Sequence, residues 1–276
     1  MAEMIDGKKI AAQIKQEIIK EINDKKLEPN LAVVLVGDDP ASKIYVNLKK
    51  KACHEVGIEF HEYLLPINIT QDQVLETIDF LNRDEKIDAI LVQLPLPKHL
   101  DTDIIIQAIN PQKDVDGFHP ENIKNFINQK SNFVPGLPLG IIKLIESTKE
   151  DLKDKQALIL AKNKILYQPL AKLLDDLRVQ TTIMLPSHPA LKNQCQQADI
   201  LITAVGKPFF VTADMIKEGA IIIDIGTNKI DNNYVVGDVD YTAVFSKAGH
   251  ITPVPGGVGP VTVAMLLYNT VKLAQK

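Results

Sequence analysis

The feature that most constrains the fold of this chain is a regular alternation of short apolar runs with amphipathic helical patterns. The runs at 31–36, 59–65 and 89–92 have the length and β-branched content of strands, and helical spacing of apolar residues lies between them. Strands joined by helices of this length need right-handed crossovers, so the pattern predicts a parallel sheet covered by helices. Ligands bind such sheets beyond the carboxyl ends of the strands.

Local signals predict where the helices begin and end. Asp39 followed by Pro40 is typical of a helix start, and Gly57 is a natural stop. Thr70 and Gln73 have the spacing of a capping box that opens the next helix. An earlier helix, capped by Asp6, has isoleucines on one face at positions 10, 14, 18 and 22.

The alternation stops at 111–140, where prolines and glycines cluster, and then resumes. We interpret 111–140 as the connection between two domains. Strands are predicted near 156–160, 179–184, 199–204 and 220–225, and a last helix at 260–274.

Composition excludes several classes of function. The net charge is −4, so the chain has no basic field that would attract nucleic acid or anionic lipid. Cys53 and Cys195 are too few for a disulfide framework, which favours reduced thiols. The N-terminus lacks the pattern of a signal peptide, and no apolar stretch reaches the roughly 20 residues of a membrane span. We expect a cytoplasmic protein.

Candidate catalytic side chains follow two of the predicted strands. Tyr45 and Lys49 lie four residues apart on the helix that begins at Pro40, so they share a face, where a ring could stack on a flat ligand beside a proton-handling amine. A solvated face is the alternative, because Lys49 opens a run of three lysines. Gln93 directly follows a strand and could orient a ligand or satisfy loop backbone.

Two aspartates lie in the stretch 113–117, which ends in a glycine. In extended backbone Asp114 and Asp116 point to opposite sides, so they would make a poor metal pair. One could bind an amino-substituted heterocycle while the other pairs locally; the alternative is an ordinary turn.

The loop at 252–262 contains three glycines and three prolines before a helix, which favours a ligand-binding loop. It lacks the lysine and hydroxyl pair of a nucleotide-hydrolase phosphate loop. The six histidines lack metal-ligand spacing, so we expect no metal site, and no serine has the glycines of a hydrolase nucleophile.

Taken in order, these segments are similar to the bifunctional methylenetetrahydrofolate dehydrogenase/cyclohydrolase family. The matching stretches are 5–8, 40–49, 92–97, 113–118, 237–240 and 252–267, and the resemblance covers nearly the whole chain. It implies two α/β domains flanking a cleft. Residues 1–134, with a C-terminal helix at 260–276 packed back on them, would form the folate-binding catalytic domain. Residues 135–259 would form a Rossmann-like dinucleotide-binding domain with a parallel sheet.

The resemblance also implies roles for individual residues. Lys49 would be the catalytic lysine, with a hydrogen bond from Gln93. Tyr45 would stack on the aminobenzoyl ring of the tetrahydrofolate substrate, and Asp116 would bind the amino-pyrimidine edge of its pterin. Further residues implied in the folate site are Leu94, Pro255, Gly256 and Val258. Those implied in NADP binding are Ala161, Lys162, Asn163, Gly206 and Thr227.

The dinucleotide motif departs from the family pattern at 161–169. Tyr167 stands where a glycine normally lets the backbone approach the pyrophosphate, and no glycine occurs between Gly140 and Gly206. Lys162 replaces an arginine, which keeps the charge but loses the bidentate fork. The junction motif is altered too, to a stretch at 135–138 without its threonine. The stretches 204–208 and 224–228, near the nicotinamide in the family, are intact.

Three functional hypotheses follow. The first is a folate one-carbon enzyme with cyclohydrolase activity and a weakened, altered or absent dehydrogenase. The second keeps both activities, with NADP held by a rearranged turn. The third is a non-catalytic folate-binding or partner subunit, against which the pair Lys49 and Gln93 argues. The resemblance further implies a homodimer in the one-carbon metabolism that serves purine biosynthesis.

Overall fold

The chain separates into two compact units in a computed structural model that describes residues 1–131, 133–231 and 234–275. The six-stranded unit comprises Met1–Ala11 and Leu137–Thr262, and the three-stranded unit comprises Ala12–Gly136 and Val263–Lys276. The first residues join the six-stranded unit because strand β1 (Glu3–Met4) pairs with β11 (His250–Ile251). The sequence-based boundaries instead grouped these residues with the catalytic domain.

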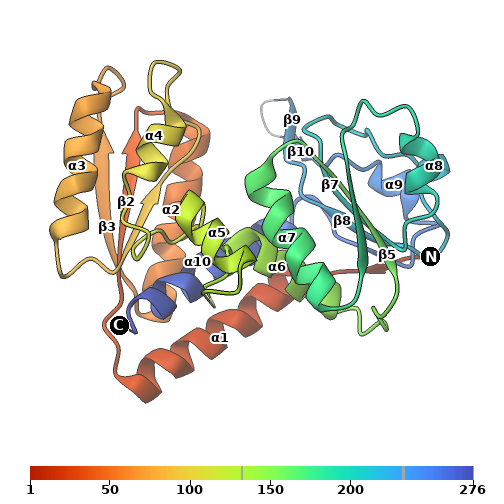
Figure 1. Ribbon diagram of the computed structural model, residues 1–276, viewed down its shortest axis with the longest axis horizontal. Helices are drawn as coiled ribbons and strands as arrows, with labels where there is room; N and C mark the ends of the chain where they lie inside the picture. Colours follow the sequence, from red (N-terminus) through yellow and green to blue (C-terminus); the bar gives the residue numbers. More distant parts are fainter. Residues whose placement is uncertain (132, 232–233, 276) are drawn as a thin grey trace. The chain divides into compact units, whose positions relative to one another are not determined.

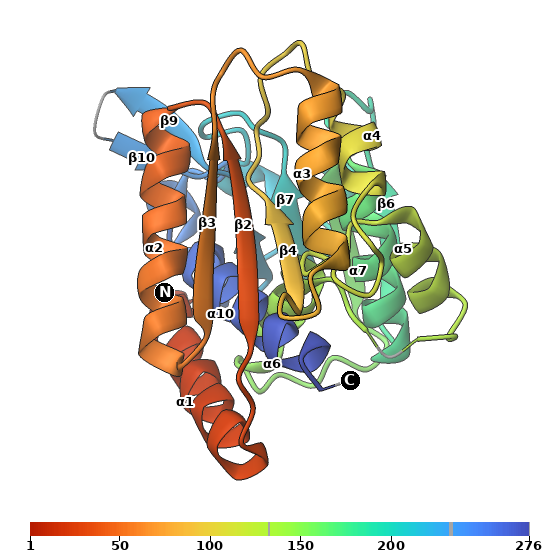
Figure 2. The ribbon, with the colours of Figure 1, turned by 90° about the vertical axis from the view of Figure 1, so that its left-hand side faces the viewer.

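The three-stranded unit is built on a parallel sheet in which β2 (Asn30–Val36) lies between β3 (Glu59–Leu65) and β4 (Ala89–Val92), as Figure 2 shows. Helix α2 (Pro40–Val56) joins β2 to β3, and α3 (Gln71–Arg83) joins β3 to β4. The predicted caps are present: Asp39 accepts from the Ser42 amide, Gly57 ends α2 in the left-handed region, and Thr70 and Gln73 form the capping box.

Distant segments complete this unit. Backbone from the 113–115 stretch pairs along β4, with the Ile90 N–H donating to the Lys113 carbonyl at 2.7 Å. Helix α10 (Val258–Leu273) returns from the end of the chain, and its buried Asn269 donates to the carbonyls of Val115 (3.0 Å) and Val134 (3.2 Å). Lys272 of α10 also binds Glu21 of α1 (Gly7–Lys25) at 2.9 Å. The predicted return of the C-terminal helix is thus confirmed.

The six-stranded unit holds a parallel sheet in the order β1-β11-β8-β7-β5-β6, seen on the right of Figure 1. Four strands lie close to their predicted positions: β5 (Gln156–Ala161), β6 (Gln180–Met184), β7 (Ile200–Ala204) and β8 (Ile221–Asp224). The other elements of this unit are α6 (Gly136–Glu146, beginning at the boundary), α7 (Lys164–Asp176), α8 (Leu191–Cys195), η1 (Ala213–Met215), β9 (Asn228–Asp231), β10 (Tyr234–Val236) and α9 (Tyr241–Val244). The α/β class predicted from the alternation is confirmed.

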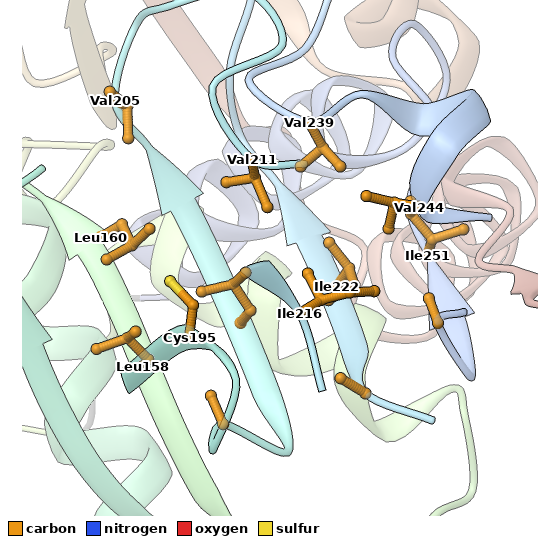
Figure 3. Packing of buried hydrophobic residues seen from close by; sticks show 14 of the residues in the cluster. Leu158, Leu160, Cys195, Val205, Val211, Ile216, Ile222, Val239, Val244 and Ile251 are labelled. Carbon is orange, nitrogen blue, oxygen red and sulfur yellow. The ribbon is translucent and has the colours of Figure 1, made fainter. Parts of the chain in front are cut away.

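A continuous apolar cluster supports this sheet. Leu158, Leu160, Leu201 and Ile222 alternate along neighbouring strands and are almost fully buried, and Figure 3 shows most of the cluster, with Cys195 packed among them. Burial of each large aliphatic side chain contributes roughly 1.5–3 kcal/mol to stability, so this cluster fixes the strands whose ends carry the loops described below. Both cysteines are buried free thiols.

The 111–140 region differs from the connection that its composition suggested. It begins with a turn at 111–113, and it also contains α5 (Pro120–Ile127) and the first turn of α6. Pro120 occupies the first turn of α5, where a missing N–H costs nothing, and the His119 ring accepts from the Glu121 amide as a cap. Here proline starts a helix instead of breaking one. Helix α4 itself spans Thr102–Gln107.

Within the described residues, no helix has the length and apolar character needed to cross a membrane.

Candidate active site

The carboxyl ends of β2 and β4 lie side by side and form the point at which the chain's crossovers change direction. After β2 the chain turns into α2 and reaches β3 on one side, whereas β4 lies on the other side. Such switch points form crevices that bind ligands in parallel sheets. Gln93 follows β4 at this point, and its backbone N–H donates to the Val34 carbonyl at 2.9 Å.

Lys49 and Gln93 are hydrogen-bonded to each other across this crevice. The Lys49 Nζ donates to the Gln93 Oε1 at 2.8 Å, and the Gln93 Nε2 donates to the Leu94 carbonyl at 2.6 Å. Because the amide nitrogen is used by the loop, the oxygen is held toward the lysine. The interpretation in which Gln93 satisfies loop backbone is confirmed, and its orientation of a ligand stays a prediction. The lysine is the donor in the bond between Lys49 and Gln93, whereas the family resemblance had implied a bond from Gln93.

Burial controls the charge on Lys49. Desolvation lowers the pKa of Lys49, and the nearby Asp116 carboxylate and Cys53 thiol oppose that shift without cancelling it. Its neighbour Lys50 is also partly buried, but its Nζ forms an ion pair with Glu62 at 3.1 Å. The solvated-face alternative describes the exposed Lys51 and not Lys49.

The two aspartates of the 113–117 stretch have separate partners. Asp114 is buried and accepts hydrogen bonds from the Gly117 amide (3.2 Å), the His119 amide (2.8 Å) and the Asn122 side chain (2.9 Å). Among the described residues, nothing donates a hydrogen bond to the Asp116 carboxylate. Burial raises the pKa of Asp116 to about 6, although Lys49 opposes the rise. Asp114 thus orders the turn, and Asp116 is left available to a ligand.

The remaining predicted folate residues divide between the units. Tyr45 is 44% exposed one turn before Lys49, and Leu94 is partly exposed beside Gln93. Pro255, Gly256 and Val258 belong to the six-stranded unit, where Gly256 has a φ of +114° that favours glycine. The placement of these three residues in a folate site stays a prediction.

The six-stranded unit has its own switch point, at the carboxyl ends of β5 and β7. Ala161 ends β5, exposed Lys162 and Asn163 form a two-residue turn, and α7 begins at Lys164 with the Asn163 side chain accepting from the Ile165 amide at 2.9 Å. Tyr167 therefore lies within the helix and not in a phosphate loop. A turn this short needs no glycine, which explains the absence of glycines from the sequence here.

The other predicted dinucleotide residues follow the neighbouring strands. Gly206 comes after β7 with a φ of +74°, and no heavy atom lies within 4 Å of the position a Cβ would take there. Thr227 follows β8 and is exposed. The exposed Lys162 and the N-terminus of α7 offer a cationic group and N–H donors at this sheet edge, which suits a phosphate-bearing dinucleotide.

Two buried residues at this edge had no predicted role. Asp224 ends β8, and Asp238 lies in the 237–240 stretch; both are almost fully buried. Burial raises the pKa of Asp224 to about 6, against three backbone N–H donors that favour the carboxylate. In the sequence, both aspartates lie near glycines in stretches that match the family, which could have indicated a role. The groups that they bind follow only from the structure.

Comparison with known proteins identifies the two domains of the chain. Residues 5–116 match the tetrahydrofolate dehydrogenase/cyclohydrolase catalytic domain, and residues 135–276 match the NAD(P)-binding domain of the same proteins. The bifunctional protein FolD of Moorella thermoacetica is 48% identical over 100% of this chain and 99% of its own length. The homologue from Acetivibrio thermocellus is 45% identical over 99% of this chain and 97% of its own.

Solved structures give the same result. The bifunctional FolD methylenetetrahydrofolate dehydrogenase/cyclohydrolase of Campylobacter jejuni is 43% identical, with a TM-score of 0.94 over 100% of this chain and 99% of that one. The Trypanosoma brucei enzyme, solved with NADP and an inhibitor, is 33% identical, with a TM-score of 0.94 over 99% of this chain and 97% of that one. The chain belongs to the tetrahydrofolate dehydrogenase/cyclohydrolase family, as the sequence motifs predicted.

Proposed function

We propose that this enzyme couples two reactions of folate one-carbon metabolism. It oxidises 5,10-methylenetetrahydrofolate with NADP and hydrolyses the resulting 5,10-methenyl compound to 10-formyltetrahydrofolate. The observation that carries this proposal is the partly buried Lys49, which is held against Gln93 near an Asp116 carboxylate to which no described residue donates a hydrogen bond. A pure folate-binding subunit would have no use for a lysine with a lowered pKa.

In the hydrolysis, water adds to the cationic methenyl carbon. The neutral amine of Lys49 takes a proton from the attacking water as the C–O bond forms. The bond from that carbon to N5 then breaks, N5 receives a proton, and the formyl group stays on N10. One water is consumed and one proton released. Desolvation lowers the pKa of Lys49 and so enlarges the neutral fraction near physiological pH.

Gln93 and Asp116 support this proton transfer in different ways. Gln93 fixes the position of the Lys49 Nζ through the 2.8 Å hydrogen bond, which limits the directions in which the amine can accept a proton. Asp116, when ionised, offers two acceptor oxygens to the amino-pyrimidine edge of the pterin. Tyr45 would stack on the aminobenzoyl ring from the same helix face.

In the oxidation, the protein mainly positions two ligands. NADP, when bound, supplies the hydride acceptor. The residues that would hold it are those at the carboxyl edge of the six-stranded sheet: Ala161, Lys162, Asn163, Gly206 and Thr227. The short turn before α7 lets Lys162 meet a phosphate as a single charge without a bidentate fork, which favours weaker dinucleotide binding than an arginine would give.

Replacement of Lys49 tests the hydrolytic mechanism. We expect Lys49→Ala and Lys49→Arg each to lower kcat for methenyl hydrolysis by about 10²-fold or more, because neither side chain can accept a proton at neutral pH. Lys50→Ala is the matched control, since Lys50 is paired with Glu62 on the same helix, and it should keep nearly full activity. An active Lys49→Arg enzyme would remove Lys49 from proton transfer.

The pH profile tests Asp116. Its carboxylate is ionised above a pKa of about 6 and protonated below it, so kcat/KM for hydrolysis should fall more steeply as the pH drops through 6. The Asp116→Asn enzyme should be weaker throughout and should lack this extra break. A wild-type profile with no change of slope between pH 5 and 7, corrected for the uncatalysed reaction, would exclude this role.

Assay of both reactions on one preparation separates the functional alternatives. We expect methenyl hydrolysis together with measurable NADP-dependent methylene oxidation, the latter with a raised KM for NADP. Hydrolysis without oxidation would identify a cyclohydrolase alone. Folate binding without either reaction would identify a partner subunit and overturn the proposal.

We also propose that the enzyme is a cytoplasmic homodimer whose product serves purine biosynthesis. Strand β6 ends the six-stranded sheet within the described part of the chain. Its Ile183 is 42% exposed and Leu185, which follows it, is 55% exposed, as suits an edge that pairs with a second copy. Sedimentation equilibrium should give twice the chain mass. Charge placed at the edge by Ile183→Lys should shift it toward the monomer, and a wild-type monomer would contradict the proposal.

A further inference from the structure

The Asp238 carboxylate accepts hydrogen bonds from several described residues at once. Its carboxylate is fully buried and accepts from the N–H groups of three successive residues in the loop after β7. The donors and their shortest distances are Val205 N (2.6 Å), Gly206 N (3.1 Å), Lys207 N (3.0 Å), Thr203 Oγ1 (3.3 Å) and Asn228 Nδ2 (2.9 Å). One carboxylate thereby ties the loop after β7 to the loop after β8.

Asp224, the last residue of β8, fixes Asp238 in turn. Its carboxylate accepts from the backbone N–H of Asp238 (3.0 Å), of Val239 (2.9 Å) and of Gly226 (2.8 Å). A Cβ at Gly226 would lie 2.4 Å from the Asp238 carboxylate, and one at Gly237 would lie 1.8 Å from the Asp224 carboxylate. The carboxylates of Asp224 and Asp238 thus occupy space that any side chain at Gly226 or Gly237 would fill.

The loops held in this way lie where a parallel sheet binds its ligand. They follow β7 and β8 at the carboxyl edge, and β7 is one side of the switch point. Val205, Val211 and Val239 belong to the apolar cluster of this unit, which Figure 3 shows. Because the carboxylate consumes the amides of 205–207, those amides are not donors to a phosphate. Their function is to fix the backbone at Gly206.

We propose that Asp238 is the positioning residue of the dehydrogenase site. It sets the loops 205–207 and 226–228 in the conformation that receives the dinucleotide, and it does so without touching the ligand. This inference rests on the proposed function, because it assumes that NADP binds at this sheet edge. It explains how the site stays formed although the turn after β5 contains no glycine.

The position requires a carboxylate. Both oxygens of Asp238 accept from N–H donors, so the amide of an asparagine would turn an NH2 group toward at least one of them and leave buried donors unpaired. Asp240, two residues on, provides a matched control. It is the N-cap of α9, and among the described residues its side chain accepts only from the Ala243 amide, at 3.1 Å, a role that asparagine performs equally well.

The test compares both activities and NADP binding in Asp238→Asn, Gly226→Ala and Asp240→Asn. We expect Asp238→Asn to raise the KM and Kd for NADP by about tenfold or more, with kcat/KM for methenyl hydrolysis unchanged within about twofold. Gly226→Ala should do the same, because its methyl group displaces the Asp238 carboxylate from a different position in the sequence. Asp240→Asn should behave as wild type in both reactions.

Amide hydrogen exchange provides a readout that needs no NADP. The amides at 205–207 should exchange slowly in the free wild-type protein and faster in Asp238→Asn. NADP should slow their exchange further in the wild type. Equal loss of both activities in Asp238→Asn would indicate a general folding role and overturn the inference. So would unchanged NADP binding. Failure of the proposed function is recognised separately, as a wild-type enzyme that binds no NADP.

Discussion

The hydrogen bond between Lys49 and Gln93 is the interaction on which the chemistry of this protein depends. A lysine on a helix surface is ordinarily a solvated cation, and the exposed Lys51 of the same helix is an example. Lys49 differs because its helix, α2, starts shortly after β2, and its Nζ donates to Gln93, which follows β4. The Gln93 amide is oriented by its bond to the Leu94 carbonyl. Desolvation lowers the pKa of the Lys49 amine, which favours its neutral, proton-accepting form.

Buried aspartates organise the loops around both candidate sites. In the three-stranded unit Asp114 binds the turn that presents Asp116, and Asn269 of α10 binds the carbonyls of Val115 and Val134. In the six-stranded unit Asp224 holds Asp238, which holds the loops after β7 and β8. In both cases, a carboxylate that accepts several backbone N–H groups replaces regular secondary structure as the support of a ligand-binding loop. Such networks are stable only when fully satisfied, and among the described residues no fully buried side-chain nitrogen or oxygen atom lacks a partner. The Asp116 carboxylate, to which no described residue donates, belongs to a partly exposed residue.

Much of the fold could be predicted, because its signals are local. Strand-length apolar runs, the Thr70 capping box and Gly57 act within a few residues, and the structure has them where the sequence placed them. The pairing of β1 with β11 could not be predicted, because two-residue strands carry no periodicity. The helix at 120–127 was missed since prolines were interpreted as breakers, although Pro120 lies in a first turn.

The candidate site was predictable in part for the same reason. Tyr45 and Lys49 share a helix face by spacing, and Gln93 follows a strand. Once a parallel sheet was assumed, the contact between Lys49 and Gln93 could be expected. The role of Asp238 was not, because its partners at 203–207 are more than thirty residues away in the sequence. The shape of the turn after β5 was also not predictable: the missing glycines indicated an altered phosphate loop, and the structure has a two-residue turn that leads directly into α7. Weakened NADP binding stays a prediction.

The most direct test of this account is the pKa of Lys49 itself, measured by NMR titration of the lysine Nζ and Cε signals in the free enzyme, with Lys49→Arg used to assign the resonance. The account predicts a pKa below the ordinary value of 10.5, and a further change when Gln93 is replaced by leucine and the acceptor is lost. A Lys49 that titrates at or above its ordinary value would contradict the account, since the amine would then be a permanent cation at physiological pH.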